Sequence, residues 1–141
     1  MKRQSILMLV AWTAFAAAAV AAPPAADDPI AQNLFPPELI MKYSGEIALD
    51  AEQRTAIKEA VMQAQTKFLG AQWEMQEETT KLVHLLQAHQ VDEKAVLSQA
   101  DRLMDLERQV KKTQLSLMVR LKNLLTQAQQ ARLADLRRAG G

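Results

Sequence analysis

The sequence predicts an all-α protein, a long antiparallel helical hairpin with a short helix at each end. Aromatic residues make up only 4% of the chain, and the hydrophobic half is mostly alanine, leucine, valine and methionine, a composition that favours helix over strand. Apolar residues recur three and four positions apart in two long stretches, which is the spacing of amphipathic helices. Because only a few residues join these stretches, the two helices must fold back on each other.

Length, charge and cysteine content limit the classes of function. A chain of 141 residues fits a single domain. The formal net charge of +1 is too small for an electrostatic nucleic-acid footprint, so we expect no nucleic-acid partner. The absence of cysteine excludes a disulfide scaffold, a thiolate zinc site, a cysteine nucleophile and a lipid anchor through cysteine.

Residues 1–21 have the pattern of a secretory signal peptide. Lys2 and Arg3 precede an apolar run that ends in small residues, and residues 19–21 (Ala-Val-Ala) fit the cleavage motif best. We therefore expect an exported protein whose mature chain begins at the next residue. The alternative is an uncleaved membrane anchor, since the apolar run lies at the short limit for a membrane span. Association with a membrane is expected only in that case.

All five prolines lie near the start of the predicted mature chain, which marks a sharp change in composition. We expect residues 22–36 to be a disordered lead-in, residues 37–138 to form the helical domain and residues 139–141 to be a tail. A short helix should cover Pro37–Ser44, because proline is tolerated at the first position of a helix.

Capping residues mark the starts of the two long helices. Asp50 can accept hydrogen bonds from the free amides of a helix over Ala51–Ala88, and Gln53 can reach back three residues to complete a capping box. Asp92 caps the second long helix, which we expect over Glu93–Leu125.

The same capping pattern occurs once more near the end of the chain. Thr126 can cap the start of a helix, and the side chain of Gln129 can reach back three residues to complete a capping box. A last helix is therefore expected over Gln127–Arg138.

The two long helices should meet along apolar stripes. On the first helix the stripe comprises Ile57, Val61, Ala64, Phe68, Ala71, Met75, Leu82, Leu85 and Leu86. Glu78 falls on this stripe and interrupts it. On the second helix the stripe comprises Val96, Ala100, Leu103, Val110, Leu117, Leu121 and Leu124, broadened by Leu106, Leu115 and Met118.

Two segments of the form Leu-[Thr/Asp]-x-x-Gln bracket the hairpin, one at Leu49-Asp50-x-x-Gln53 and one at Leu125-Thr126-x-x-Gln129. A pair of such motifs around a long helical hairpin, behind an export segment, resembles the Spy/CpxP-like periplasmic family with its LTxxQ motifs. The segments 34–39 and 122–126 look most like its heavy-metal sensor and resistance branch, the CnrX/ZraP-like proteins. The first motif carries Asp50 where the family usually has threonine, and aspartate is an equally good cap.

The resemblance implies a fold and a range of activities. It implies a bent four-helix cradle that pairs into a homodimer in the periplasm. It also implies non-catalytic binding, as an ATP-independent chaperone of unfolded proteins or as a stress-signalling adaptor of a periplasmic sensor domain. The alternative that it implies is a heavy-metal sensor or resistance accessory, coupled to a membrane regulator.

A second apolar stripe on the first long helix indicates a binding surface. Met62, Leu69 and Trp73 lie in a narrow arc, rotated by about 140° from the main stripe at 100° per residue. A two-helix hairpin cannot bury both arcs by itself. We therefore expect this arc to pack within the molecule, to contact a second copy of the chain, or to bind a client.

The sequence offers little for a metal site or for catalysis. His84 and His89 are five residues apart and do not share a helix face, which leaves Glu59, Met62 and Met118 as the metal candidates. We expect no resident cofactor. No nucleophile lies beside a histidine or a carboxylate pair in a recognisable pattern, and no phosphate-binding loop is present, so we do not expect an enzyme.

Overall fold

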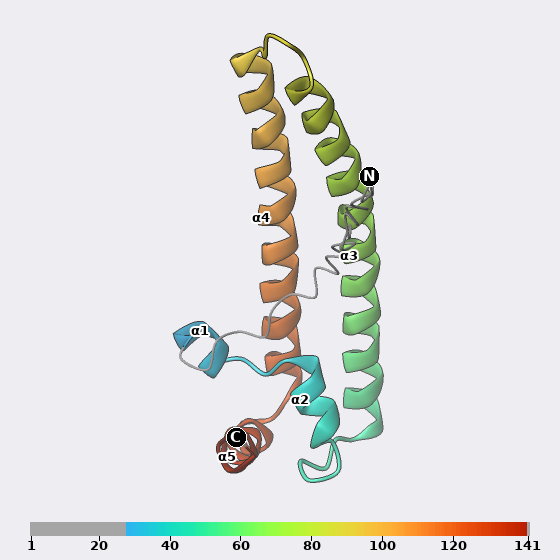
Figure 1. Cartoon of the computed structure of the whole chain (residues 1–141). Coiled ribbons are helices and arrows are strands. Elements are labelled where there is room, and N and C mark those ends of the chain that lie inside the picture. Colours follow the sequence, from blue (N-terminus) through green and yellow to red (C-terminus); the bar gives the residue numbers. More distant parts are fainter. Residues whose placement is uncertain (1–27, 141) are drawn as a thin grey trace, which may run out of the picture.

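The computed structural model describes residues 28–140 and is entirely helical over that range, without a β-strand. The expected signal peptide at residues 1–21 lies outside the described residues. Figure 1 shows the elements, which are α1 (Pro29–Gln32), α2 (Pro37–Lys42), α3 (Ala51–Leu86), α4 (Glu93–Leu124) and α5 (Gln127–Ala139). The last four begin where the sequence predicts and end within about two residues of the expected ends.

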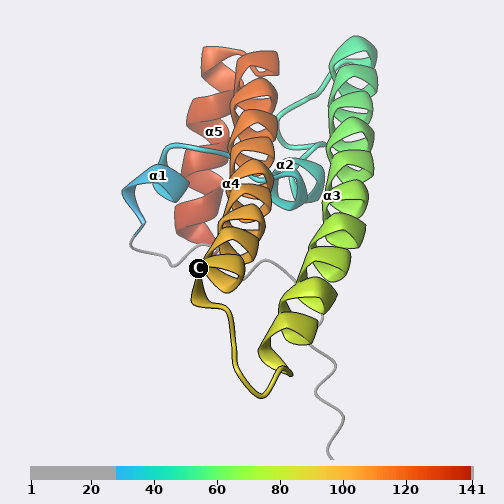
Figure 2. The same ribbon diagram turned by 90° about the horizontal axis from the view of Figure 1, so that it is seen from above.

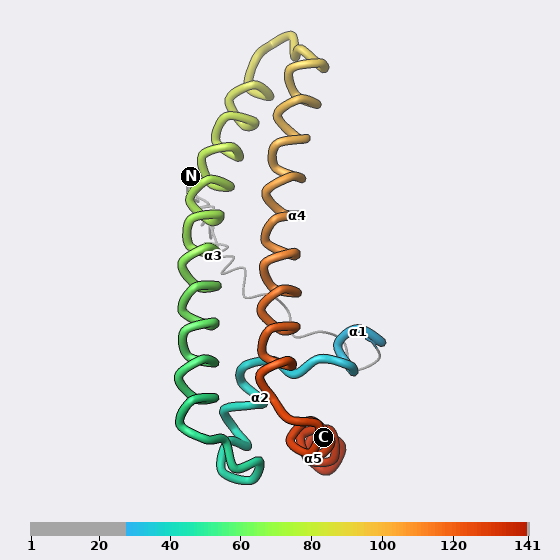
Figure 3. The backbone as a smooth tube through the Cα atoms, turned by 180° about the vertical axis from the view of Figure 1, so that it is seen from behind, coloured from blue at the N-terminus to red at the C-terminus, as the bar shows by residue number. Residues whose placement is uncertain are grey.

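The two long helices α3 and α4 pack side by side in opposite directions and form the predicted hairpin (Figures 1 and 3). The three short helices gather at the end of the hairpin that lies away from the α3–α4 turn. α5 runs across the base of the hairpin, where it is seen end-on in Figures 1 and 3 and lengthwise in Figure 2, and it contacts α2. The all-α hairpin predicted from the sequence is confirmed.

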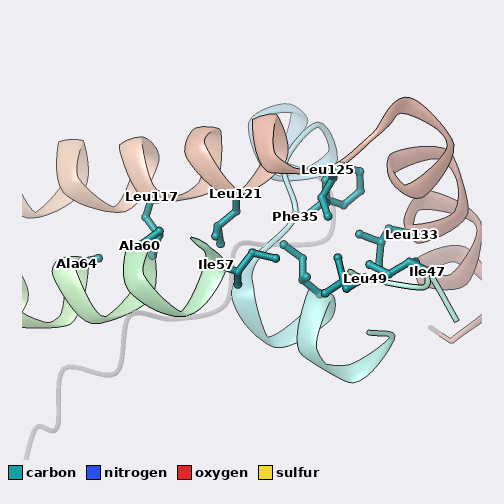
Figure 4. Packing of buried hydrophobic residues seen from close by; sticks show 11 residues of the cluster. Phe35, Ile47, Leu49, Ile57, Ala60, Ala64, Leu117, Leu121, Leu125 and Leu133 are labelled. Carbon is teal, nitrogen blue, oxygen red and sulfur yellow. The ribbon is translucent and has the colours of Figure 1, made fainter. Parts of the chain in front are cut away.

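The hydrophobic core sits where the short helices meet the base of the hairpin (Figure 4). Its most buried large side chains come from four different helices, namely Ile40 of α2, Ile57 of α3, Leu121 of α4 and Leu133 of α5. Each of these four helices therefore contributes an aliphatic anchor to one cluster. The base is the part of the fold where substitution by smaller residues would leave the largest cavities.

Towards the turn the seam between α3 and α4 becomes thinner. Ala60, Ala64 and Leu117 are buried close to the base, whereas most apolar residues further along the seam are only half-buried. Two expectations are wrong, because Leu86 of the α3 stripe is 52% exposed and Leu115, expected to broaden the α4 stripe, is 45% exposed. A residue two positions before Leu117 is rotated by about 160° from it, so its side chain points away from the seam.

The expected disordered lead-in is also wrong where the structure describes it. Asp28 caps α1 by accepting a hydrogen bond from the amide of Ile30, and Pro29 takes the first helical position. Leu34 and Phe35 are then buried, at 7% and 5% exposure. Residues 28–36 therefore belong to the folded domain, because they bury apolar side chains in its core.

No helix within residues 28–140 is long and apolar enough to cross a membrane.

Candidate functional site

The first motif forms a complete capping box at the start of α3. The carboxylate of Asp50 accepts from the amide of Gln53 at 2.7 Å, and the side-chain oxygen of Gln53 accepts from the amide of Asp50 at 3.2 Å. Leu49, which precedes the cap, is 4% exposed. The leucine therefore enters the core while the two polar residues satisfy amides that the helix leaves free.

The second motif forms the same box at the start of α5. The hydroxyl of Thr126 accepts from the amide of Gln129 at 3.2 Å, and the side-chain oxygen of Gln129 accepts from the amide of Thr126 at 2.9 Å. Leu125 is buried like Leu49, at 5% exposure. The capping roles predicted for both motifs are confirmed.

The two boxes meet in space through their glutamines. Nε2 of Gln53 donates to Oε1 of Gln129 at 2.8 Å, and Nε2 of Gln129 donates to Oε1 of Gln53 at 3.0 Å. Each amide also donates to a backbone carbonyl, from Gln53 to Leu124 at 2.8 Å and from Gln129 to Ile47 at 3.1 Å. This joint ties the start of α3 to the end of α4 and the start of α5.

The equivalence of the two motifs extends one residue beyond the glutamines. Nε of Arg54 donates to the carbonyl of Leu49 at 3.1 Å, and Nε2 of Gln130 donates to the carbonyl of Leu125 at 3.2 Å. In each motif a long polar side chain thus returns to the carbonyl of the buried leucine. The sequence shows a polar residue after each glutamine, but nothing in the spacing of the motifs indicates that this residue contacts the carbonyl of the leucine.

Arg137 of α5 holds the segment after α1, a role that sequence reasoning missed. Its guanidinium donates to the carbonyls of Ala31, Gln32 and Leu34. It also lies 5.1 Å from the ring centroid of Phe35, within range of a cation–π contact. Partial burial lowers the pKa of Arg137 below its usual value, but arginine keeps its charge at neutral pH.

The second apolar arc predicted on α3 is exposed. Met62, Leu69 and Trp73 are 55%, 56% and 62% exposed. We call these three residues the α3 outer stripe. Beyond the base, the described part of the chain places no third helix alongside α3 and α4 (Figure 3). Within one copy of the chain, residues 28–140 therefore leave the α3 outer stripe open to solvent.

An equivalent exposed stripe runs along α4. Leu97, Met104 and Leu115 are spaced by seven and eleven residues, which places them within about 20° of one another around the helix, and they are 57%, 51% and 45% exposed. We call them the α4 outer stripe. The seven- and eleven-residue spacing was the signal that could have found this surface in the sequence.

The two outer stripes lie on the sides of the hairpin that face away from the seam. At 100° per residue, Leu69 lies about 140° around α3 from Ala64 and Leu115 lies about 160° around α4 from Leu117, so each stripe points away from the partner helix. The hairpin therefore presents apolar side chains along both of its outer sides.

Glu78, which interrupts the seam of α3, has a polar partner across it. Nε2 of Gln99, a buried side chain, donates to the carboxylate of Glu78 at 2.5 Å and to its carbonyl at 2.8 Å. Lys81 and Arg102 place cations 2.5 and 3.9 Å from the same carboxylate. The hydrogen bond from Lys81, followed by that from Gln99, lowers the pKa of Glu78 below its usual value of 4.5.

The metal candidates lie on two helices and differ in exposure. Glu59 and Met62 are exposed on α3, whereas Met118 is half-buried on α4. Over residues 28–140, no three histidine, cysteine, aspartate or glutamate side chains are grouped so that they could hold a metal ion. Both histidines, His84 and His89, are exposed near the turn of the hairpin.

Comparisons of the chain with protein-family models, with curated proteins and with solved structures found no match.

Proposed function

We propose that the chain is an exported, homodimeric protein of the Spy/CpxP-like class that acts by binding other proteins without catalysis. The observation that carries the proposal is the joint between Gln53 and Gln129, in which two capping motifs of the same form meet and hydrogen-bond each other. Two capping boxes that occurred independently would not be expected to hydrogen-bond each other through their glutamines. The joint supports reading the two motifs as one structural unit that brackets the hairpin.

The outer stripes supply the binding surface in this proposal. Long, exposed apolar edges with polar residues between them suit weak and adaptable contacts with another protein. The α3 outer stripe carries Trp73, and exposed tryptophan is the kind of side chain that dominates the energy of a protein interface. Its partner is an unfolded protein, a periplasmic sensor domain or a second copy of the chain.

Replacing Trp73 by serine tests this role. We expect Trp73→Ser to weaken suppression of aggregation of a chemically unfolded client in the absence of ATP, to reduce the dimeric fraction in sedimentation, or to do both. Met41→Ser is a matched control, because Met41 is 63% exposed but lies on α2, away from the hairpin edges. The proposed role is wrong if Trp73→Ser changes neither measurement, or if the control changes both by the same amount.

Export is a separate part of the proposal and has its own test. Mass spectrometry of the protein recovered from the periplasm should give a mature chain that begins at Ala22. Recovery of the intact chain from the membrane fraction would instead favour an anchored protein.

A further inference from the structure

We propose that the groove between α3 and α4 that Gln63 and Ser116 line is a binding site for a phosphate group. The groove has a volume of about 240 Å³ and is lined by residues of both helices. Its cations are Lys67 of α3 with Lys112 and Arg120 of α4. The proposal does not depend on the function proposed above, because none of the residues that line the groove belongs to an outer stripe.

The small residues of the seam create the space for this groove. Ala60 and Ala64 form its floor together with Leu117, and all three are buried. Larger side chains at the two alanines would fill the space between the helices. The groove therefore has an apolar floor and a polar rim, so a ligand in it would be partly shielded from water, which strengthens its electrostatic contacts.

The charges on the rim have no acidic partner within residues 28–140. The ion pairs that the structure describes all use other basic residues, and no carboxylate lines this groove. One carboxylate lies in a neighbouring groove, which Glu74 lines together with Lys67. Three cations around one concavity repel one another, and an anion placed among them would relieve that repulsion.

One of the cations is already positioned across the seam. Nη1 of Arg120 donates to the side-chain oxygen of Gln63 at 3.0 Å, which links α4 to α3 at the rim. This bond uses only part of the guanidinium, whose planar set of donors matches two oxygens of one anion. Holding the arginine in place in advance lowers the entropy that a ligand would lose on binding.

The neutral groups of the rim favour phosphate over a carboxylate. Thr113 and Ser116 add two hydroxyl groups to the three cations. A phosphate group carries between one and two negative charges near neutral pH and several strong acceptor oxygens, whereas a carboxylate carries one charge and two oxygens. The number of donors and the positive charge of the rim therefore match a phosphate group better.

Two sources could supply such a group, a free phosphate compound or the headgroup of an anionic phospholipid. The direct experiment is calorimetric titration of the purified protein with inorganic phosphate at constant ionic strength, with acetate as the carboxylate comparison. We expect saturable binding of phosphate at a single site and weaker binding of acetate. A parallel experiment measures sedimentation with vesicles of phosphatidylglycerol and phosphatidylcholine against vesicles of phosphatidylcholine alone.

The variant Lys112→Gln with Arg120→Gln tests the location, and we expect it to weaken phosphate binding by about tenfold or more because two charged contacts are lost. The matched control is Lys111→Gln with Arg132→Gln, which removes the same charge from exposed residues outside the groove. Thermal unfolding provides a second measurement, since phosphate should raise the melting temperature of the wild type and of the control more than that of the groove variant.

The titration and the vesicle experiment together distinguish a soluble phosphate compound from a phospholipid headgroup. Phosphate binding that only the groove variant loses supports the site and, without vesicle binding, points to a soluble phosphate compound. Vesicle binding that depends on phosphatidylglycerol and on the same two residues points to a lipid headgroup. The proposal is overturned if neither phosphate nor vesicles bind, if acetate binds as tightly as phosphate, or if both double variants lose binding equally.

Discussion

The side chains of Gln53 and Gln129 each complete the cap of their own helix and also hydrogen-bond each other. One pair of side chains therefore caps the starts of α3 and α5 and joins them. The pair also satisfies the carbonyls of Leu124 and Ile47, which lie at the end of α4 and in the turn before α3. The position of the short helices at the base of the hairpin therefore depends on these two amides as well as on the apolar core.

Replacing either glutamine by alanine should lower the free energy of unfolding by about 1–3 kcal/mol, because partly buried polar groups lose their partners. The double variant should cost less than the sum of the two single variants, with a coupling of about 0.5–3 kcal/mol. Urea unfolding of the four proteins measures this cycle. Gln127→Ala serves as the control, since Gln127 is an exposed neighbour, and additive effects of the two glutamines would contradict the joint.

Arg137 should be necessary for the order of residues 28–36. We expect Arg137→Ala to increase hydrogen exchange in this segment and to lower stability, because three carbonyls lose their donor and Phe35 loses its stacked cation. Arg137→Lys should rescue only part of the effect, since an ammonium cannot reproduce the planar set of donors. Arg138→Ala is the control, as the side chain of Arg138 is 77% exposed and pairs only with Asp135. Equal exchange in both alanine variants would refute the role of Arg137.

Acid should loosen the part of the hairpin near its turn. The pKa of Glu78 is lower in the folded protein than its usual value of 4.5, so its contribution to stability is present above that value. The contribution is lost as the pH falls through the folded pKa. Hydrogen exchange of the helix ends near the turn should therefore rise in acid more in the wild type than in Glu78→Gln. Glu77→Gln should behave like the wild type, and an identical acid response in all three proteins would exclude this role of Glu78.

Titration with nickel, cobalt, zinc or copper should give no tight binding at a single site, because residues 28–140 hold no group of three histidine, cysteine, aspartate or glutamate side chains placed to share an ion, which leaves only Glu59, Met62 and Met118 as weak candidates. Calorimetry on the metal-free protein measures this. Micromolar binding of one ion per chain would contradict the prediction and would favour the heavy-metal alternative.

Local sequence patterns predicted the helices well but could not predict contacts between distant residues. Asp50, Asp92 and Thr126 marked helix starts correctly, because capping depends only on the next few residues. The link between Gln53 and Gln129 depends on how the chain folds back, and nothing in the spacing of the motifs reveals it.

Two of the failed expectations have reasons that the contacts explain. The proline-rich composition suggested a disordered segment, yet Phe35 and Leu34 enter the core and Arg137 binds the carbonyls beside them. The failed assignment of Leu115 to the seam shows that an apolar residue on a helix can belong to a second stripe instead. A helical wheel drawn for α4 would have separated the two stripes.

The measurement that tests the central claim most directly is photo-crosslinking from the α3 outer stripe. A benzoylphenylalanine placed at Leu69 should form adducts with an unfolded client, with a sensor domain or with a second copy of the chain, and the mass of the adduct distinguishes them. The same group at Gln109, an exposed position of α4 that lines a groove between the two helices and belongs to neither outer stripe, should form few. Equal yields from the two positions, or no adduct from Leu69, would contradict the binding role of the stripe.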